Sequence, residues 1–291
     1  MRLLRYLIVS GSAAAMAGAV TFSGVTASTV AAPALASHAP SARFLAQART
    51  ALVGYLRHHH PRAMLAPGRA HSIKGVTATQ TFNWSGYVDT SSTHQAFTKV
   101  SGNWTTPSVT CNAEDQIITN WIGLDGFNSN SVEQLGTISW CFQGKPVYFT
   151  WFEMFPGNVT EVGKSLAPGD KIAASVTRSG TSYTLKLTDS THPANSFTRT
   201  ATCALTKCLD TSAEWISERP SFSIGIVPQA HYNAFKITNG SQTSSGHTGT
   251  IGAGPGVNAL TMVDATSTYN LNTVSTLTGG NSFSTTWKNS Y

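Results

Sequence analysis

The sequence of 291 residues predicts an all-β fold, arranged as one antiparallel β-sandwich over residues 79–291. From residue 79 onward the chain is rich in Thr, Ser, Val and aromatic residues, and Gly, Asn and Pro separate the segments. Apolar and polar residues alternate within many of these short segments. Charged residues make up only 11% of the chain, and no useful helical period occurs in this part. Many short strands without helices favour an antiparallel sandwich.

The clearest hairpin is expected at residues 171–188. Two alternating runs, 171–178 and 183–188, flank a turn at Ser179-Gly180-Thr181. Further strands are expected over four stretches, which are 100–105, 147–152, 213–217 and 234–238. The pattern contains no repeat, so we expect a single β domain.

Residues 1–36 predict a secretory signal peptide. Arg2 and Arg5 precede an apolar stretch, and Ala34-Leu35-Ala36 is a small-x-small cleavage pattern. A membrane anchor is the alternative interpretation, but the apolar stretch is short for a bilayer and is interrupted by Ser and Thr. We therefore expect a secreted protein that has no contact with a membrane after processing.

Residues 37–78 predict a basic propeptide with one amphipathic helix. Apolar residues recur at helical spacing between Phe44 and Leu56, and the segment 58–61 (His-His-His-Pro) ends the helix. A disordered basic linker is an equally good interpretation of the same composition. As a propeptide, its arginines and histidines would cover an acidic cleft near neutral pH, and acid would weaken the attraction. Processing is then expected within about residues 66–79.

The net charge of +6 does not indicate a nucleic-acid-binding protein. Residues 1–79 hold eight Lys or Arg and no acidic residue, whereas the rest of the chain holds 11 basic and 13 acidic residues. A nucleic-acid-binding domain carries its basic patch on the folded part. We therefore expect no nucleic-acid partner.

Four cysteines in an exported chain suggest two disulfides. Three pairings are possible, and nearness along the chain favours Cys111–Cys141 and Cys203–Cys208. Zinc is the competing interpretation, but the sequence has neither a C-x-x-C pair nor an H-E-x-x-H motif. We expect no metal and no other cofactor.

Common hydrolase motifs are missing from the sequence. It has no G-x-S-x-G motif for a serine hydrolase. The histidines beyond residue 79 stand in no recognisable catalytic context, and they are His94, His192, His231 and His247. Carboxyl and amide side chains remain as candidates for chemistry.

The segment 212–218 carries one such candidate, Glu214. Strand alternation places Glu214, Ile216 and Glu218 on one face and Trp215 on the other. A carboxyl group beside an aromatic ring can have a raised pKa and exchange protons. The alternative is an edge-strand glutamate that prevents aggregation.

Two further segments carry candidates. Residues 120–126 form an apolar strand that ends in an Asp-Gly turn, and the following strand, 131–136, carries Gln134. In the segment 148–156, Glu153 shares a face with aromatic residues. Such an acid either lines a substrate cleft or is buried and hydrogen-bonded, because aromatic stripes usually belong to a core.

Taken in order, five segments of the chain resemble the glutamic peptidases, or eqolisins, a family of fungal acid proteases with bacterial relatives. They are 83–88 (Asn-Trp-Ser-Gly-Tyr-Val), 121–126 (Trp-Ile-Gly-Leu-Asp-Gly), 134–136 (Gln-Leu-Gly), 151–156 (Trp-Phe-Glu-Met-Phe-Pro) and 213–218 (Ala-Glu-Trp-Ile-Ser-Glu). The resemblance covers about residues 80–240. No single segment is specific, whereas the ordered set is.

The resemblance implies a sandwich of two large antiparallel sheets, similar to the concanavalin A-like, jelly-roll-like shape. It also implies an acid endopeptidase acting on proteins or peptides, and we expect a monomer. By position, Gln134 and Glu214 match the catalytic pair of the family. The positions that match its cleft are Trp84, Trp121, Asp125, Trp151 and Glu153.

Two alternatives remain from the sequence. A carbohydrate-binding or glycoside-cleaving sandwich would stack its aromatic rings on sugars and use Glu153 and Glu214 as its carboxyl pair. An inactive binding module on the same scaffold is the third possibility. Glu133 stands directly before Gln134, and alternation predicts that it points away from the cleft.

Overall fold

The computed structural model describes residues 40–67, 71–73, 75–113, 115–223 and 225–290. The predicted signal peptide lies outside these residues. Among the described helices, none has the length and apolar character needed to cross a membrane.

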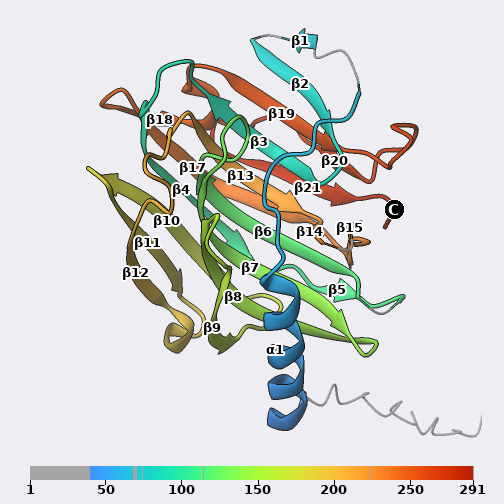
Figure 1. Cartoon of the computed structure of the whole chain (residues 1–291). Helices are drawn as coiled ribbons and strands as arrows, with labels where there is room; N and C mark the ends of the chain where they lie inside the picture. Colours follow the sequence, from blue (N-terminus) through green and yellow to red (C-terminus); the bar gives the residue numbers. More distant parts are fainter. Residues whose placement is uncertain (1–39, 68–70, 74, 114, 224, 291) are drawn as a thin grey trace, which may run out of the picture. The chain divides into compact units, whose positions relative to one another are not determined.

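Two large sheets confirm the predicted antiparallel sandwich (Figure 1). Sheet A has nine strands, which in spatial order are β1 (His71–Ile73), β2 (Val76–Thr81), β19 (Val257–Met262), β3 (Trp84–Thr90), β13 (Ser212–Glu218), β6 (Ile117–Leu124), β7 (Val132–Phe142), β8 (Lys145–Phe155) and β9 (Thr160–Ser165). Sheet B has eight, which are β12 (Phe197–Thr202), β11 (Ser182–Asp189), β10 (Lys171–Ser179), β4 (Phe97–Thr105), β17 (Phe235–Ser244), β21 (Phe283–Trp287) and β20 (Asn272–Val274), with β18 (His247–Thr250) beside β17. Within these sheets the pairing is antiparallel except between β2 and β19.

Short elements complete the described chain. Two small sheets pair β5 (Val109–Thr110) with β16 (His231–Tyr232), and β14 (Ser221–Phe222) with β15 (Gly225–Ile226). Two 3₁₀ turns lie at η1 (Pro193–Asn195) and η2 (Ile251–Ala253). The predicted hairpin is confirmed as β10 and β11, with Ser179 opposite Ser182.

The main core lies between the two sheets. Inward-facing apolar residues come from both, including Ile122, Leu135, Val100, Val176 and Leu185. Two tryptophans also tie the sheets together through their indole N–H groups. Trp215 donates to the carbonyl of Ser101 at 2.8 Å, and Trp104 donates to the hydroxyl of Thr137 at 3.3 Å. Trp215 therefore faces inward, and Ile216 lies on the other face of β13, as the predicted alternation of the two residues requires.

The other face of sheet A is also apolar, and helix α1 (Ala42–Leu56) packs on it. The hydroxyl of Ser41 caps the helix by accepting from the main-chain N–H of Phe44 at 3.3 Å. Ala48, Leu52 and Leu56 recur every fourth residue and are buried. Their apolar partners on this outer face of sheet A include Trp84, Trp121, Trp140, Phe149, Trp151 and Ile216. The predicted helix is confirmed, and it covers a surface that would otherwise be exposed.

Both disulfides that nearness favoured are present. Cys111–Cys141 joins residues 30 positions apart, and Cys203–Cys208 joins residues 5 positions apart. Each bond restricts the unfolded chain, and the larger loop restricts it more.

Candidate active site

A row of four residues crosses the outer face of sheet A. Glu214 of β13 lies opposite Gly123 of β6, and Gly123 lies opposite Gln134 of β7. Gln134 in turn lies opposite Glu153 of β8. Directly opposed residues on antiparallel strands point to the same face of a sheet. Gln134, Glu153 and Glu214 therefore share the face that α1 covers.

Gln134 and Glu153 belong to a buried group that also contains His59 and Glu218. The Nε2 of Gln134 donates to Oε2 of Glu153 at 2.6 Å, and Nδ1 of His59 lies 3.1 Å from the same oxygen. Nε2 of His59 lies 3.7 Å from Oε1 of Glu218. We call these four residues the imidazole–carboxyl cluster. Its histidine bridges two carboxyl groups that come from β8 and β13.

Glu218 is fixed through one of its two oxygens. The indole N–H of Trp121 donates to Oε2 at 2.8 Å, and the hydroxyl of Thr119 lies 3.4 Å from the same atom. Oε1 accepts no hydrogen bond among the described residues, and it is the oxygen nearest to His59. One oxygen is thus held by the sheet while the other faces the imidazole.

Burial and charge set the pKa values in the cluster. Burial opposes the charge on His59, but the Glu153 and Glu218 carboxylates together raise its pKa to about 10. Burial raises the pKa of Glu153, whereas His59 and the Gln134 amide counteract part of that rise. The charged form of the imidazole is therefore favoured near neutral pH, and Glu153 takes up a proton more readily than an exposed glutamate does.

Glu214 stands apart from the cluster. Both of its carboxyl oxygens are buried, and neither has a hydrogen-bond partner in the described part of the chain. Burial raises the pKa of Glu214 well above the usual range, and the Asp125, Glu133 and Asp89 carboxylates raise it further. The carboxyl that directly contacts Gln134 is that of Glu153, not that of Glu214.

The three predicted cleft tryptophans lie on this same face. Trp84 and Trp121 meet edge-on with ring centroids 4.9 Å apart, and Trp151 lies edge-on to His59 at 6.2 Å. All three are buried beneath α1 and the residues that follow it. A role in binding substrate stays a prediction for each of them.

Asp125 is engaged elsewhere. Its carboxylate accepts from the main-chain N–H groups of Asp210 at 2.6 Å and Thr211 at 2.8 Å, and from the hydroxyl of Ser131 at 3.1 Å. These bonds join the turn after β6 to the loop before β13. In this structure Asp125 holds the loop that leads into β13, and a direct contact with substrate stays a prediction.

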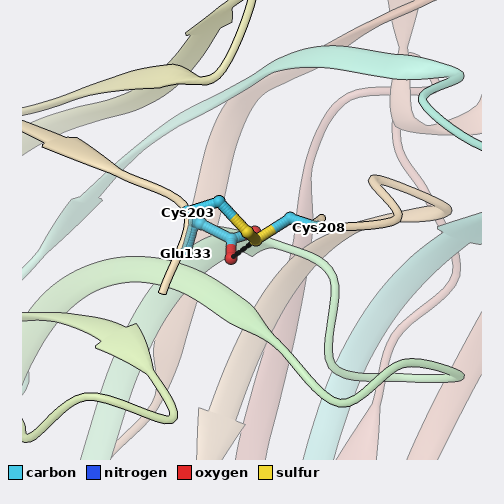
Figure 2. Close-up of side chains that lie close together, drawn as sticks. All are labelled: Glu133, Cys203 and Cys208. Carbon is cyan, nitrogen blue, oxygen red and sulfur yellow. Dashed lines mark hydrogen bonds between the residues drawn. A yellow bond between two sulfur atoms is a disulfide. The ribbon is translucent and has the colours of Figure 1, made fainter. Parts of the chain in front are cut away.

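Glu133 points away from the cluster, as alternation predicts. Figure 2 shows its carboxyl beside the Cys203–Cys208 disulfide, and Oε1 lies 3.0 Å from Sγ of Cys208. A disulfide sulfur carries no hydrogen, so it can only accept a hydrogen bond here, and such a bond needs a protonated carboxyl group. Burial raises the pKa of Glu133 well above the usual range, and Asp125 and Asp210 raise it further. Glu133 is therefore packed between the sheets in surroundings that favour its neutral form.

Oxygen ligands converge at one buried point, where Asp125, Glu133 and Asp210 approach within 4.8 Å of one another. Asp210 already pairs with Arg178 at 3.1 Å and accepts from the hydroxyl of Tyr183 at 2.7 Å. Protein donors thus serve the Asp125 and Asp210 carboxylates, and the raised pKa of Glu133 favours its neutral form. This group of acids is better explained as a hydrogen-bonded part of the core than as a metal centre.

Sequence reasoning missed His59 and Glu218 as members of the site. Glu218 carried a signal, because alternation places it on the same face as Glu214. His59 carried no such signal apart from its place in the basic segment. Its partners in the site lie 94 residues or more further along the chain.

Comparisons with known proteins agree with the fold. A model of the Peptidase A4 family matches residues 82–287. Scytalido-glutamic peptidase, solved with a transition state analog inhibitor, is 22% identical, with a TM-score of 0.60 over 71% of this chain and 98% of that one. SCP-B, a member of the eqolisin family, is 22% identical with a TM-score of 0.58 and the same coverage. Aspergilloglutamic peptidase from Aspergillus niger is 22% identical, with a TM-score of 0.52 over 60% of this chain and 100% of that one.

No curated protein matches the chain in sequence. The similarity to the solved structures supports a shared sandwich fold. The family model matches most of the chain and therefore shows to which family the chain belongs. The chain therefore belongs to the Peptidase A4 family, the eqolisins or glutamic peptidases, whose members hydrolyse peptide bonds.

Proposed function

We propose that this chain is a secreted acid endopeptidase, made as a precursor, that cleaves proteins with Gln134, a carboxylate of β13 and an activated water. The observation that carries the proposal is the buried cluster, in which an imidazole lies between the Gln134–Glu153 pair and Glu218. The imidazole fills a space lined by an amide and two carboxyl groups. Such a space suits a water molecule and a peptide carbonyl once the imidazole leaves.

Glu218 is the better candidate for the reacting carboxylate of β13. A general base must be oriented and must have a free oxygen within reach of the proton that it accepts. Trp121 holds Oε2 of Glu218, and Oε1 faces the imidazole. Glu214, which the family resemblance suggested, has no such anchor among the described residues and is not joined to the cluster. Its predicted role is untested, and the contacts favour Glu218.

The proposed reaction uses one water and no covalent intermediate. Ionised Glu218 accepts a proton from the water, whose oxygen attacks the scissile carbonyl carbon. The Gln134 amide has a second N–H beside the one given to Glu153, and it can donate this hydrogen to the developing oxyanion. Protonated Glu218 then passes its proton to the leaving nitrogen as the C–N bond breaks. The products are a new carboxyl group and a new amine.

Activity at acid pH is consistent with two carboxyl groups around one space. Without the imidazole, no positive charge compensates Glu153, and the nearby Glu218 carboxylate favours retention of a proton on Glu153. The state with one neutral and one ionised carboxyl group is the state that the reaction needs. Burial of Glu153, which raises its pKa, extends this state toward higher pH.

Secretion and peptide substrates have independent support. Two disulfides are typical of exported proteins. SCP-B was solved in a complex with the tripeptide Ala-Ile-His, and scytalido-glutamic peptidase with a peptide-based transition state analog. Membership of a peptidase family favours this function over the glycoside-cleaving alternative.

The proposal is tested by incubating the purified precursor with unfolded casein from pH 2 to pH 8. We expect cleavage at acid pH that neither pepstatin nor a metal chelator inhibits. Gln134→Ala is expected to lower turnover by about a hundredfold to a thousandfold, the usual effect of losing one oxyanion donor. A Gln134→Ala variant that keeps its fold by circular dichroism and cleaves at the wild-type rate would overturn the proposed function.

A further inference from the structure

The chain from α1 to residue 66 covers the proposed site, and we call residues 42–66 the covering segment. Its helix contributes apolar side chains, and aromatic contacts extend them. Tyr55 meets Trp140 edge-on at 5.8 Å, and Phe44 lies 5.4 Å from Phe142. The helix thus rests on aromatic residues of β7, the strand that also carries Gln134.

Beyond the helix, the covering segment is fixed by main-chain hydrogen bonds. The N–H of His60 donates to the carbonyl of Ser221 at 2.9 Å, and the N–H of Ala63 donates to that of Gly126 at 3.4 Å. The Asn83 side chain accepts from the N–H of Met64 at 2.8 Å and donates to the carbonyl of Arg62 at 2.9 Å. Residues 60–64 are therefore bound through their backbone, as a peptide ligand would be.

His59 is the residue of the covering segment that enters the cluster. It is 6% exposed, whereas the adjacent His58 and His60 are exposed to solvent. Its ring contacts Glu153 and Glu218 through its two nitrogens and lies beside Trp151 and Phe222. A histidine that only filled apolar space would not need both nitrogens directed at carboxyl groups.

We propose that the covering segment is an intramolecular inhibitor in which the His59 imidazole occupies the place of the water and scissile peptide between Gln134–Glu153 and Glu218. This inference rests on the proposed function, because it names how that site is kept closed. The sequence suggested only that the basic segment as a whole covers an acidic cleft, whereas the structure points to one histidine, His59.

The pH dependence follows from the groups that face His59, which are Glu153 of β8 and Glu218 of β13, beside the neutral amide of Gln134. Contact with the carboxylates raises the pKa of His59 from 6.5 to about 10. The contact between charged His59 and the carboxylates therefore stabilises the closed state fully below pH 6.5. This stabilisation is lost as the pH rises toward 10. In the other direction, acid protonates Glu153, and this ends the charge attraction between its carboxylate and the imidazole. Closure is therefore firmest in mildly acidic to neutral solution, and acid releases it.

The test compares His59→Ala with the matched control His58→Ala in the full chain. Hydrogen exchange of the α1 amides at pH 6, corrected for intrinsic rates, reports closure without any need for catalysis. We expect exchange in His59→Ala to be faster by about tenfold or more, because two buried carboxyl groups lose their partner. The His58→Ala control should exchange as the wild type does, and wild-type protection should fall on acidification.

His59→Gln is the second variant, in case His59→Ala fails to fold. An amide can still form hydrogen bonds with the carboxyl groups but cannot carry charge. After correction for intrinsic rates, its α1 amides should be equally protected at pH 6 and pH 9, whereas those of the wild type should be less protected at pH 9. The proposal is overturned if both His59 variants keep the exchange profile of the wild type.

Cleavage of casein by the same samples separates the two proposals. The His59→Ala precursor should cleave at pH 6 without prior acid treatment, whereas the wild type should need that treatment. If acid-treated wild type never cleaves, the proposed function fails, whatever the exchange data show. If acid-treated wild type cleaves and the His59→Ala precursor stays as closed and as inactive as the untreated wild type, the inhibitor proposal alone fails.

Discussion

The Gln134 amide donates a hydrogen bond of 2.6 Å to the Glu153 carboxyl, and these two residues are direct partners across β7 and β8. The bond leaves one N–H and the carbonyl oxygen of Gln134 available. An amide needs such an anchor if it is to present a hydrogen to an oxyanion, because a freely rotating side chain has to be ordered again at every turnover.

Removal of this anchor should therefore slow catalysis. We expect Glu153→Ala to lower kcat by about tenfold to a hundredfold while KM changes little, the pattern of an interaction that acts in the transition state. Met154→Ala is the matched control, since Met154 is the next residue on β8 and points to the opposite face. Steady-state kinetics of the matured enzymes measures both constants. An unchanged kcat in Glu153→Ala would show that Glu153 does not orient Gln134 for catalysis.

The covering segment should loosen when its buried helix face is trimmed. Leu52 is fully buried against the outer face of sheet A, while its neighbour Val53 is 41% exposed. Leu52→Ala leaves a cavity that costs about 2–5 kcal/mol, so the closed state should open at a higher pH than in the wild type. Exchange of the α1 amides during an acid titration measures this shift. Equal shifts for Leu52→Ala and Val53→Ala would contradict the packing described here.

Glu133 should make the free energy of unfolding depend on pH. Its pKa is raised well above the usual range in the folded chain, so the folded state binds this proton more tightly than the unfolded state. That contribution is complete at low pH and is lost as the pH rises above the ordinary carboxyl range. We expect Glu133→Gln, which cannot ionise, to gain stability relative to the wild type at pH 7 but not at pH 4. Urea unfolding at both values provides the measurement, and a difference that does not change with pH would refute the assignment of a neutral Glu133.

The two disulfides should differ in their contribution. In the chain-entropy model, the bond that joins residues 30 apart contributes about 3.7 kcal/mol, and the bond that joins residues 5 apart contributes about 2.2 kcal/mol. Replacement of Cys111 and Cys141 by Ser should therefore lower the free energy of unfolding more than replacement of Cys203 and Cys208. Denaturant unfolding of the two double variants gives the order, and the reverse order would show that contacts around Cys208 and Glu133 outweigh loop size.

Much of the fold was predictable because its information is local. Alternation along 212–218 correctly places Trp215 and Ile216 on opposite faces, which the structure shows to be the core and the outer face. The spacing of apolar residues correctly predicts α1. Nearness along the chain also predicts both disulfides. These features depend on residues that are close in sequence.

The site was less predictable because it depends on which strands are neighbours. Alternation places Glu214 and Glu218 on one face, but only the pairing with β6 puts Thr119 beside Glu218 and Gly123 beside Glu214. The hydrogen bond from Trp121 to Glu218 follows from that register. His59 was harder still, since its contacts join a segment outside the sandwich to residues on two of its strands.

The central claim is that Glu218, rather than Glu214, works with Gln134. The most direct measurement is the turnover number of Glu218→Gln and Glu214→Gln, each matured by a specific protease at a site inserted after Pro67 and assayed on unfolded casein at acid pH. We predict that Glu218→Gln loses about a hundredfold to ten-thousandfold in turnover, the usual value of a general base, while Glu214→Gln stays within about tenfold of the wild type. Loss of turnover in Glu214→Gln with retention in Glu218→Gln would contradict the account.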